Sequence, residues 1–465
     1  MRVCFRKTAY LLLISIIISL CPYAFGYWTP EVRIGEPGVC WQPRMAVTGD
    51  TLHVIFVNDH GNEKIDYLRS INRGRSWTSG RMLSDTINTD NAYFPRILIY
   101  GQKILVLWRN IFLLGPYDYN IGYARSTNGG ATWSAPAYIF SHNSLHLLPF
   151  AMANHDSLVN LIYGELTDTN SIFYDVKSTN FGASWGQPTE VFQACESSDM
   201  DMASEGNNFY YVWSGALFDT TTYWDTFYMK SSDNGNAWSS LVPITPIDQN
   251  ESYWPSLSTN GQGHVVFCWT DWMHSPNWFT ADIYIKTSSD YGETWTDPNQ
   301  ISFTHWESGP DIFWQADTIH AVWKTDNGGL GKIIYRRSND DGLTWGQETR
   351  LDHDTSDSMT PQVAASDGNA YVIFTDTRPN PDTVGWGIYF TRYLSYLPGD
   401  ANNSGDVNGL DVVYLVNYFK GFGPPPEPFL SGDANGNCVV NGLDVVYLVN
   451  YLRGFGQPPI AGNCP

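Results

Sequence analysis

Two stretches near the C-terminal end of the 465-residue chain place oxygen-bearing side chains at a spacing that suits a metal ion. In each stretch, positions 1, 3, 5, 9 and 12 of a twelve-residue loop carry Asp, Asn or Ser, and position 7 offers its backbone carbonyl. Hard oxygen ligands in this pattern are typical of calcium sites, so the sequence predicts two bound Ca²⁺ ions. The predicted ligands are Asp400, Asn402, Ser404, Asp406, Asn408 and Asp411 in the first loop, and Asp433, Asn435, Asn437, Val439, Asn441 and Asp444 in the second.

The two loops differ at position 6, which is Gly405 in the first loop and Cys438 in the second. The sharp turn there favours a backbone conformation that glycine adopts freely and that other residues resist by ~1–2 kcal/mol. We therefore expect the first loop to bind calcium more tightly, helped by the nearby charge of Asp406. Cys438 either forms a disulfide with Cys464 or is a small apolar filler beside a disordered Cys464, and the sequence leaves both possibilities open.

A second set of chemically capable side chains recurs between residues 41 and 378. Its carboxylates could supply the acid–base pair of a glycosidase, and its aromatic rings could stack on sugar rings. The alternative is that an acidic protein collects carboxylates around any opening in its surface. The candidate catalytic carboxylates are Asp59, Glu165, Asp199, Asp201, Asp271, Glu307, Asp311 and Asp376, with Asp326 beside them, and the candidate substrate-binding residues are Trp41, Arg44, Tyr93, Arg96, Arg109, Tyr253, Trp254 and Arg378.

These residues are embedded in a repeat of roughly fifty residues, marked by the stretch SSDYGETW and five close copies of it. The Asp or Asn at its third position can accept hydrogen bonds from the turn's own backbone amides, and the glycine two residues later supplies a positive φ. The closing tryptophan offers an apolar face to a neighbouring repeat. The six copies, called the repeated turns below, are Ser70–Trp77, Ser126–Trp133, Ser178–Trp185, Ser231–Trp238, Ser288–Trp295 and Ser338–Trp345.

Short alternating strands at this period predict an all-β propeller, in which the candidate residues would converge on one mouth. A seventh repeat follows the six, without a repeated turn and without a fourth strand. The segment Tyr27–Ile34 matches the segments that follow the other turns. We therefore expect it to pair with residues 388–394 and to close a ring of seven blades, which leaves no open sheet edge.

The repeated turn is similar to the Asp box of the sialidase-like, BNR-repeat β-propellers, in which it is structural and lies away from the active site. Sialidases of this family have six blades and bind the substrate carboxylate with three arginines, the first in a Tyr/Phe-Arg-Ile-Pro motif. Here the corresponding stretches are CWQPRM and YFPRIL, in which arginine follows proline, and no arginine lies between Arg125 and Arg336. The comparison therefore disfavours a true sialidase.

The two C-terminal loops, each followed by the amphipathic stretch NGLDVVYLVNY, resemble the EF-hand-like repeats of a type I-like dockerin module. The resemblance implies a cohesin module on a scaffold protein as the partner, and a place in a multi-enzyme assembly that degrades polysaccharides. At the positions that select the cohesin in that family, this chain has Gly409-Leu410 and Gly442-Leu443 instead of the usual Ser-Thr or Ala-Ile pairs. The alternative is a calcium-stabilised appendage without a partner.

Residues 1–26 begin with basic residues, continue with a short apolar run and end with small residues, as secretory signals do. We divide the chain into a signal peptide at 1–26, a propeller at 27–395 and a dockerin at 396–465. The net charge of −21 argues against nucleic acid and anionic membranes as partners. Seven cysteines, less Cys4 and Cys21 of the signal, leave five, and an odd number does not fit a disulfide scaffold.

These features together predict a secreted, extracellular component of a cohesin–dockerin assembly that hydrolyses O-glycosidic bonds. A first alternative is a non-catalytic propeller that binds a glycan or a protein and is tethered to a scaffold by its dockerin. A second alternative is a surface adhesion protein without a sugar ligand.

Overall fold

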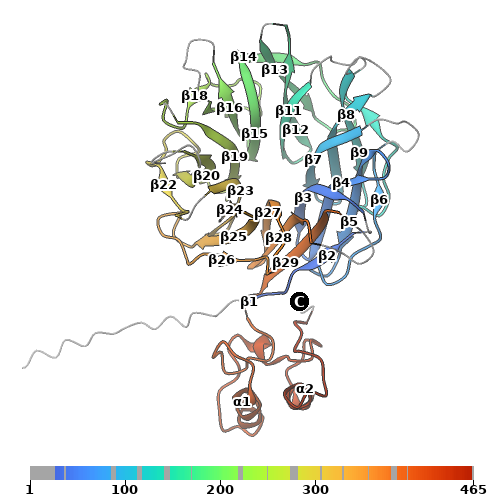
Figure 1. Ribbon diagram of the computed structural model, residues 1–465, viewed down its shortest axis with the longest axis vertical. Helices are drawn as coiled ribbons and strands as arrows, with labels where there is room; N and C mark the ends of the chain where they lie inside the picture. The colour runs from blue at the N-terminus through green and yellow to red at the C-terminus, as the bar shows by residue number, and fades with distance from the viewer. Residues whose placement is uncertain are drawn as a thin grey trace, which may run out of the picture. The chain divides into compact units, whose positions relative to one another are not determined.

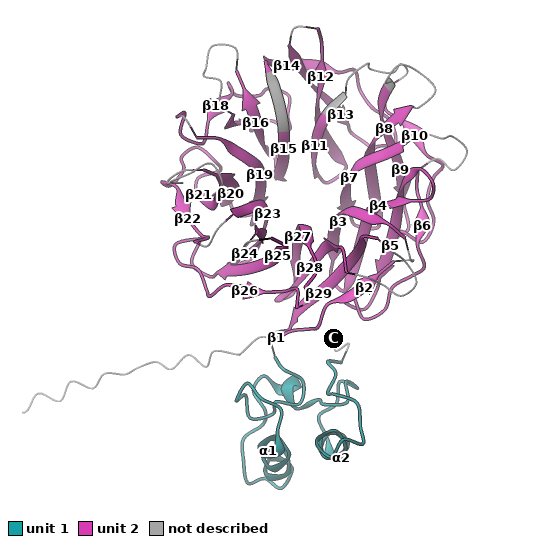
Figure 2. Cartoon of the chain, viewed as in Figure 1, with its two compact units in different colours: residues 1–27, 395–465 teal, residues 28–394 magenta. Residues whose placement is uncertain are grey.

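The computed structural model divides the chain into two compact units, which are coloured separately in Figure 2. One unit spans Trp28–Leu394, and the other contains Ser395–Pro465 together with the N-terminal residues up to Tyr27. The structure describes residues 27–462 except 36–37, 85–90, 113–117, 141–146, 169, 218–223, 249, 273–280, 304–305, 327–328, 354, 379–384 and 395. The predicted signal peptide and Cys464 therefore lie outside the described residues.

The larger unit is a ring of seven antiparallel sheets, the blades of a β-propeller (Figure 1). In each blade the strands succeed one another from the axis outward, and the innermost strand contacts the innermost strands of the two adjacent blades. The seven-bladed ring predicted from the repeats is confirmed.

The outermost strand is only two residues long in five of the blades. Blades one to three comprise β3 (Cys40–Thr48), β4 (Thr51–Asp59), β5 (Glu63–Ser70) and β6 (Arg81–Met82); β7 (Asn91–Tyr100), β8 (Lys103–Phe112), β9 (Asp118–Ser126) and β10 (Ala137–Tyr138); β11 (Leu147–His155), β12 (Leu158–Leu166), β13 (Ser171–Ser178) and β14 (Thr189–Ala194). Blades four to seven comprise β15 (Glu196–Glu205), β16 (Asn208–Ala216), β17 (Asp225–Ser231) and β18 (Val242–Pro243); β19 (Ser252–Thr259), β20 (Val265–Asp271), β21 (Asp282–Ser288) and β22 (Asn299–Gln300); β23 (Trp306–Gln315), β24 (Thr318–Asp326), β25 (Gly331–Ser338) and β26 (Thr349–Arg350); β27 (Ser358–Ser366), β28 (Asn369–Asp376) and β29 (Gly387–Leu394).

The N-terminal segment completes blade seven. Strands β1 (Tyr27–Trp28) and β2 (Val32–Ile34) both pair with β29, and β2 does so in antiparallel register, with Val32 opposite Phe390 and Ile34 opposite Ile388. The predicted closure is thus confirmed. Because the first and last strands of the propeller share one sheet, blade seven has an outer strand like the other blades, and β29 is not left as an exposed edge.

The repeated turns have the hydrogen bonds that the sequence predicts. In the fifth copy, Ser288 Oγ donates to Asp290 Oδ1 at 2.8 Å and accepts from Gly292 N–H at 2.9 Å. Asp290 Oδ1 also accepts from Thr294 N–H at 2.9 Å. Gly292 has a φ of 72° and Tyr291 before it a φ of 59°, so the turn contains two successive left-handed residues. The same bonds recur in the other five copies.

The tryptophan that ends a repeated turn packs against the third strand of the preceding blade. In most blades the partner is an aromatic ring that meets the indole edge to face, an arrangement that aromatic quadrupoles favour. The N-terminal segment continues the pattern, because Trp28 takes the place of the missing turn tryptophan of blade seven. The pairs are Tyr67–Trp133 at 4.8 Å between ring centroids, Tyr123–Trp185 at 6.2 Å, Tyr228–Trp295 at 5.3 Å, Tyr335–Trp28 at 4.7 Å and Phe390–Trp77 at 5.2 Å.

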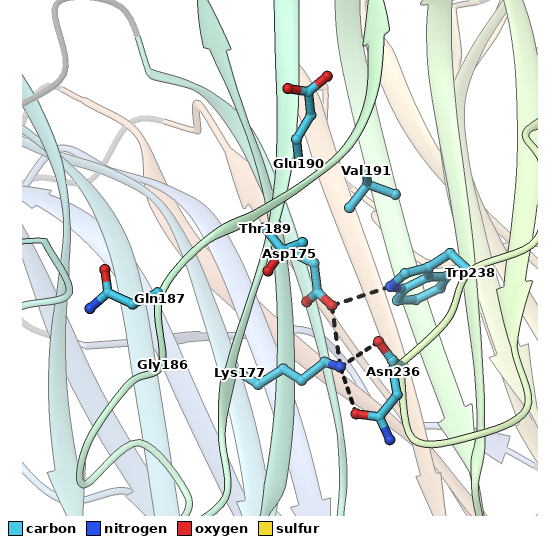
Figure 3. Close-up of a pocket in the computed structure, with 10 residues that line it drawn as sticks. Asp175, Lys177, Gly186, Gln187, Thr189, Glu190, Val191, Asn236 and Trp238 are labelled. Atoms are coloured by element: carbon cyan, nitrogen blue, oxygen red, sulfur yellow. Dashed lines mark hydrogen bonds and ion pairs between the residues drawn. The ribbon is translucent and has the colours of Figure 1, made fainter.

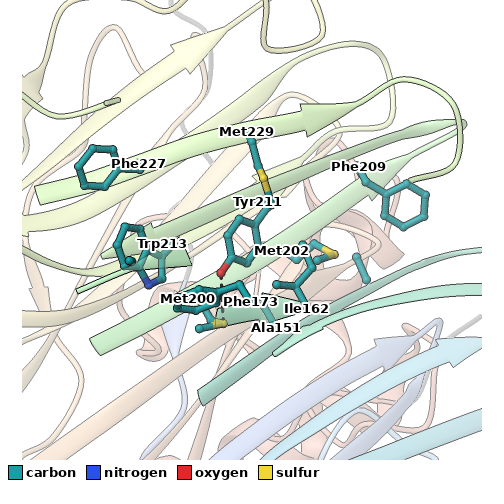
Figure 4. Close-up of a cluster of buried hydrophobic side chains, with 12 residues drawn as sticks. Ala151, Ile162, Phe173, Met200, Met202, Phe209, Tyr211, Trp213, Phe227 and Met229 are labelled. Carbon is teal, nitrogen blue, oxygen red and sulfur yellow. Dashed lines mark hydrogen bonds between the residues drawn. The ribbon is translucent and has the colours of Figure 1, made fainter. Parts of the chain in front are cut away.

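Buried apolar side chains fill the rest of the space between blades. Figure 4 shows the cluster between blades three and four, in which Met200 and Met202 of β15 pack with Phe173 of β13 and with Tyr211 and Trp213 of β16. Tyr211 Oη donates a hydrogen bond to Met200 Sδ at 3.4 Å. Each blade therefore buries both faces against its neighbours, as propeller sheets must.

The smaller unit contains two short helices with identical N-terminal ends, α1 (Gly409–Phe419) and α2 (Gly442–Leu452), and a 3₁₀ turn, η1 (Phe429–Gly432). Leu415 and Leu448, one on each helix, are fully buried in its small core. No helix in the described part of the chain is long and apolar enough to cross a membrane.

Candidate functional site

The innermost strands are bulged near their starts, on the face of the ring that the sequence designated as the mouth. In five blades a residue with a φ of about 50–57° precedes a proline at this point, and the pairing with the second strand shifts there. A bulge re-aims the side chains of a strand end. Phe94 in blade two and Trp254 in blade five occupy this left-handed position, and both rings are well exposed, at 38% and 39%.

Four aromatic rings gather at this face of blade five, and we call them the blade-five aromatic cluster. Tyr253 is central: its ring centroid lies 5.6 Å from Trp224, 5.7 Å from Trp254 and 6.1 Å from Trp272. Tyr253 and Trp254 are predicted substrate-binding residues. Trp224 and Trp272 were missed, because they stand one residue outside the strands β17 and β20 and not at the strand positions from which the candidates were read. A convergence of rings on one exposed patch is a typical sugar-binding surface.

Carboxylates lie beside these rings. Glu251 Oε2 accepts a hydrogen bond from Tyr253 Oη at 2.5 Å. Asp271 is buried and accepts from Trp269 Nε1 at 2.6 Å and from Ser252 Oγ at 2.9 Å. The sequence predicted Asp271 as a candidate but missed Glu251, which precedes the strand.

Asp225 is the most perturbed carboxylate of this group. Its side chain is 1% exposed, and its Oδ1 has no hydrogen-bond partner among the described residues. Burial raises the pKa of Asp225 to about 7, and the charges of Asp248, Asp271 and Glu251 add to that rise. A carboxyl group that holds its proton near neutral pH can act as an acid. The sequence did not indicate Asp225, because it begins a third strand and its burial and acidic neighbours arise only in the folded ring.

Five of the predicted residues meet on the axis of the ring and form a charge cluster: Arg44, Arg96, Asp199, Asp201 and Asp311. Asp201 Oδ2 accepts from Leu257 N–H of the next blade at 2.9 Å, and Asp311 Oδ2 accepts from Val363 N–H of the next blade at 2.8 Å. These contacts join innermost strands that share no backbone ladder.

The charges on the axis compensate one another. Arg96 Nη2 donates to the carbonyl oxygen of Met200 at 3.2 Å, across the ring from blade two to blade four. Burial raises the pKa of Asp311 to about 7, with Arg44 and Arg96 opposing the rise and Asp201 adding to it. Since Asp201 and Asp311 each accept a hydrogen bond from a backbone amide of the next blade, they hold blades together, a role that sequence patterns alone do not distinguish from catalysis.

A smaller aromatic group lies on blade two. The guanidinium of Arg109 stands 4.4 Å from the ring centroid of Phe94 and 5.6 Å from that of Tyr119. Tyr93 Oη accepts from Asn91 Nδ2 at 3.2 Å, and burial together with Glu63 raises the pKa of Tyr93 to about 12. Two predicted binding residues, Tyr93 and Arg109, therefore lie together, separately from the blade-five aromatic cluster.

Other predicted residues have local structural partners. Asp59 Oδ1 accepts from Gly61 N–H in an exposed hairpin turn at 2.8 Å. Glu307 is fully buried, and its Oε1 accepts from Thr325 Oγ1 at 3.0 Å. Asp326 forms an ion pair with Lys324 at 3.3 Å.

Blade seven contains a buried ion pair of two predicted residues. Asp376 Oδ2 accepts from Arg378 Nη2 at 3.0 Å, and the Arg378 guanidinium lies 3.9 Å from the ring centroid of Tyr389. Of the remaining two, Trp41 packs edge to face on Trp386 at 6.2 Å, and Glu165 lies near Tyr163, whose pKa is raised mainly by burial.

In the smaller unit, each loop folds around its own carboxylates. Asp400 Oδ1 accepts from Ser404 N–H at 2.9 Å and its Oδ2 from Gly405 N–H at 2.7 Å. Asp411 Oδ1 accepts from Asn402 N–H at 3.2 Å and its Oδ2 from Asn408 N–H at 2.8 Å. Asn408 is also the N-cap of α1, so the loop and the helix start share residues.

The donor set suits a hard cation. Asp400 and Asp411 are 2% and 0% exposed, and neither forms an ion pair with a basic side chain in the described part of the chain. Burying two carboxylates without a counter-charge is costly, and a bound cation would remove that cost. Burial raises the pKa of Asp411 and of Asp444, and the charge of the first carboxylate of each loop adds to the rise.

The second loop differs from the first at positions 4 to 7. Cys438 at its sixth position has a φ of 66°, and Gly405 in the first loop a φ of 90°, so the predicted left-handed turn is confirmed in both loops. At position 4 it is the second loop that has the glycine: Asn403 of the first loop has a φ of 53°, and Gly436 of the second has a φ of 71°. Each loop thus has one glycine and one other residue in a left-handed conformation. Cys438 is disulfide-bonded, whereas its predicted partner, Cys464, lies outside the described residues.

Comparisons with known proteins agree with this two-part architecture. Residues 398–453 match the family described as dockerin type I domain. No curated protein matches the chain significantly. An ulvan lyase, described as a new family of polysaccharide lyase, superposes with a TM-score of 0.57 and 11% identity over 77% of this chain and 95% of its own. A second polysaccharide lyase superposes with a TM-score of 0.51 and 10% identity over 75% of this chain and 88% of its own. A Hadza microbial sialidase superposes with a TM-score of 0.45 and 16% identity over 61% of this chain and 63% of its own.

At 10–11% identity the two lyase structures establish the fold alone. The chain thus has a seven-bladed β-propeller followed by a type I dockerin domain.

The raised pKa of Asp225 predicts a pH-dependent stability. A carboxyl whose folded pKa lies above its unfolded value stabilises the fold below the unfolded pKa and loses that contribution as the pH rises towards about 7. Asp225→Asn should therefore gain stability relative to wild type between pH 4 and pH 7, by about 1.4 kcal/mol for each unit of pKa shift.

Urea unfolding followed by tryptophan fluorescence at several pH values measures this difference. Asp59→Asn, which alters an exposed carboxylate, is the control and should follow the wild type throughout. A pH-independent difference between Asp225→Asn and wild type would contradict the assignment.

Proposed function

We propose that the protein is a secreted component of a cohesin–dockerin assembly whose propeller binds a polysaccharide at the blade-five aromatic cluster and hydrolyses its O-glycosidic bonds. Type I dockerin domains bind calcium, and a dockerin implies a cohesin-bearing scaffold as partner. The activity, the export and the substrate class are the proposed parts.

The observation that carries the proposal is the juxtaposition of Tyr253, Trp254 and the carboxylate of Glu251. Ring faces bind the apolar faces of sugars, and a carboxyl group at the same place can, in its protonated form, donate a proton to the glycosidic oxygen as the bond to the sugar breaks. Glu251 is only half-buried, so it can reach a bound glycan, whereas Asp225 is covered. Asp201 and Asp311 are poorer candidates, because a backbone amide of the adjacent blade already donates to one oxygen of each carboxylate.

The dockerin unit presents repeated apolar side chains that suit a protein partner. Leu410 and Leu443, at the partner-selecting position of the two loops, are 65% and 62% exposed. Val413 and Val446, one helical turn further, are also exposed. Exposed apolar residues in a constant arrangement on both helices are typical of a docking surface.

A polysaccharide screen with matched variants tests the glycan proposal. Trp254→Ala should weaken binding of the active polysaccharide about tenfold, or ~1.4 kcal/mol, through loss of a stacking face. Phe94→Ala removes the aromatic ring from the corresponding bulge of blade two and should leave the affinity within about twofold of wild type. Glu251→Gln should retain binding and lose cleavage by ~10²-fold or more.

Reducing-end release, unsaturated-product absorbance and affinity electrophoresis together separate the possible outcomes. Reducing ends without unsaturated products are the expected result. Unsaturated products would show that the reaction is elimination and not hydrolysis. Binding without any cleavage would establish the non-catalytic alternative. Failure of every polysaccharide to bind, or equal effects of Trp254→Ala and Phe94→Ala, would refute the proposed site.

Calcium titration of the full chain tests the two loops. We expect two sites, with the first loop the tighter, because asparagine tolerates a left-handed φ better than cysteine and because Asp406 adds charge. Each loop has one non-glycine residue in a left-handed conformation, so the strain partly cancels between the loops. The difference in calcium affinity should therefore be smaller than the tenfold that ~1.4 kcal/mol of strain at position 6 alone would give.

The matched variants are Asp411→Asn and Asp444→Asn, each of which removes the twelfth ligand of one loop. Calorimetry should show loss of the tighter site in Asp411→Asn and of the weaker site in Asp444→Asn. Loss of the tighter site in Asp444→Asn would reverse the assignment.

A further inference from the structure

Blade three departs from the contact that joins the other blades. Three residues before the serine of each repeated turn, four blades have a tyrosine, blade five has Ile285 and blade three has Asp175. Ile285 still fills its place with an apolar side chain beside the turn of blade six. Asp175, by contrast, puts a carboxylate where an aromatic ring would meet Trp238 of blade four. A single exception in a repeated packing position is where function is expected to override packing.

The missing ring coincides with a pocket of about 440 Å³ between blades three and four, drawn in Figure 3. Its lining includes Asp175 and Lys177 from β13, Thr189 and Glu190 from β14, and Asn236 and Trp238 from the repeated turn of blade four. Pockets of ~300–1,000 Å³ are the usual size for small ligands. The cavity is thus large enough for a ligand.

Among the described residues, one carboxylate oxygen of Asp175 has hydrogen-bond partners and the other has none. Its Oδ2 accepts from Trp238 Nε1 at 3.2 Å and pairs with Lys177 Nζ at 3.7 Å (Figure 3). The residue is only 6% exposed, and its Oδ1 is buried and has no hydrogen-bond partner in the described part of the chain. A buried acceptor without a partner costs ~1–3 kcal/mol, and a ligand that donates to it would remove that cost.

The ammonium of Lys177 is already engaged by blade four. It donates to the carbonyl oxygen of Gly235 and, at 3.2 Å, to Asn236 Oδ1. Arg69 makes the corresponding contact in blade one, to the carbonyl oxygen of Gly129 at 2.6 Å, so this is a recurring bond between blades. Lys177 is therefore a structural cation and not a free anion-binding group.

The lining restricts the class of ligand. The carboxylates of Asp175 and Glu190 would repel an anion, and Lys177, which lies beside Asp175, would repel a cation. An apolar molecule would leave Asp175 Oδ1 unsatisfied and find few apolar walls apart from Val191 and Trp238. A neutral molecule with several hydroxyl groups and one apolar face satisfies both the acceptors and the indole.

We propose that this pocket is a second carbohydrate site, which binds a neutral sugar ring against Trp238 with a hydroxyl group donating to Asp175 Oδ1. It lies beside the repeated turn of blade four, whereas the blade-five aromatic cluster lies where the innermost strands begin. The two sites therefore belong to opposite ends of the blade strands. The pocket goes beyond the proposed catalytic function, since it would hold a chain of the polysaccharide away from the site of cleavage.

Asp175→Tyr tests the proposal by restoring the residue that most other blades have. The tyrosine should fill the pocket, pair with Trp238 and raise the melting temperature of the propeller. Binding of methyl glycosides of glucose, galactose, xylose, arabinose and rhamnose to the full chain is measured by saturation-transfer NMR. At least one should bind to wild type at millimolar concentration, and its affinity should fall at least tenfold in Asp175→Tyr.

Ile285→Tyr is the matched control, because it introduces the same residue at the same position of blade five, far from the pocket, and should bind as wild type does. Thr189→Trp blocks the pocket from the exposed strand β14 and should also abolish binding, which keeps the test valid if Asp175→Tyr fails to fold. The Trp254→Ala background removes the blade-five site. A glycoside that binds to Trp254→Ala and no longer binds to Asp175→Tyr therefore reports binding at the pocket, even if no polysaccharide is cleaved. Absence of glycoside binding to wild type, or binding that survives in folded Asp175→Tyr and Thr189→Trp, would overturn the proposal.

Discussion

The propeller depends on the contact between the tryptophan of each repeated turn and the third strand of the blade before it. One blade is a small sheet with two apolar faces, and it cannot be stable until both are covered. The turn is held by hydrogen bonds of its own, such as those of Asp290 and Ser288, so contacts within one blade fix the backbone that carries the indole. Trp28 provides the same contact where the seventh turn is missing, and it thereby joins the two ends of the propeller.

This arrangement leaves the ends of the strands free to vary. In blades two and five, the bulge at the start of the innermost strand exposes an aromatic residue before the proline, Phe94 in blade two and Trp254 in blade five. Trp224, which precedes β17 of blade four, and Trp272, which follows β20 of blade five, add two more rings, and the result is an aromatic patch beside carboxylates.

Much of the fold was predictable, because it is encoded in short-range patterns. Gly292 marks a left-handed turn, the alternation of strands marks the blades, and the spacing of Asp400 to Asp411 marks a cation loop. The site was less predictable, because side chains from different blades meet only after closure. Asp201 and Asp311 are of the residue type that catalyses glycoside hydrolysis, yet each accepts a hydrogen bond from a backbone amide of an adjacent blade. Asp225 acquires its perturbed pKa from burial and from three acidic neighbours that the sequence does not place together.

The central claim is that the blade-five aromatic cluster, and not the charged axis, receives the glycan. A crystal structure of the full chain soaked with an oligosaccharide from the polysaccharide that it binds most tightly tests this claim directly. The account predicts a sugar ring in van der Waals contact with Trp254 or Tyr253, at about 4 Å, and a hydroxyl or glycosidic oxygen within hydrogen-bond reach of Glu251. An oligosaccharide ordered on the axis against Arg44 and Arg96, with the aromatic cluster empty, would contradict it.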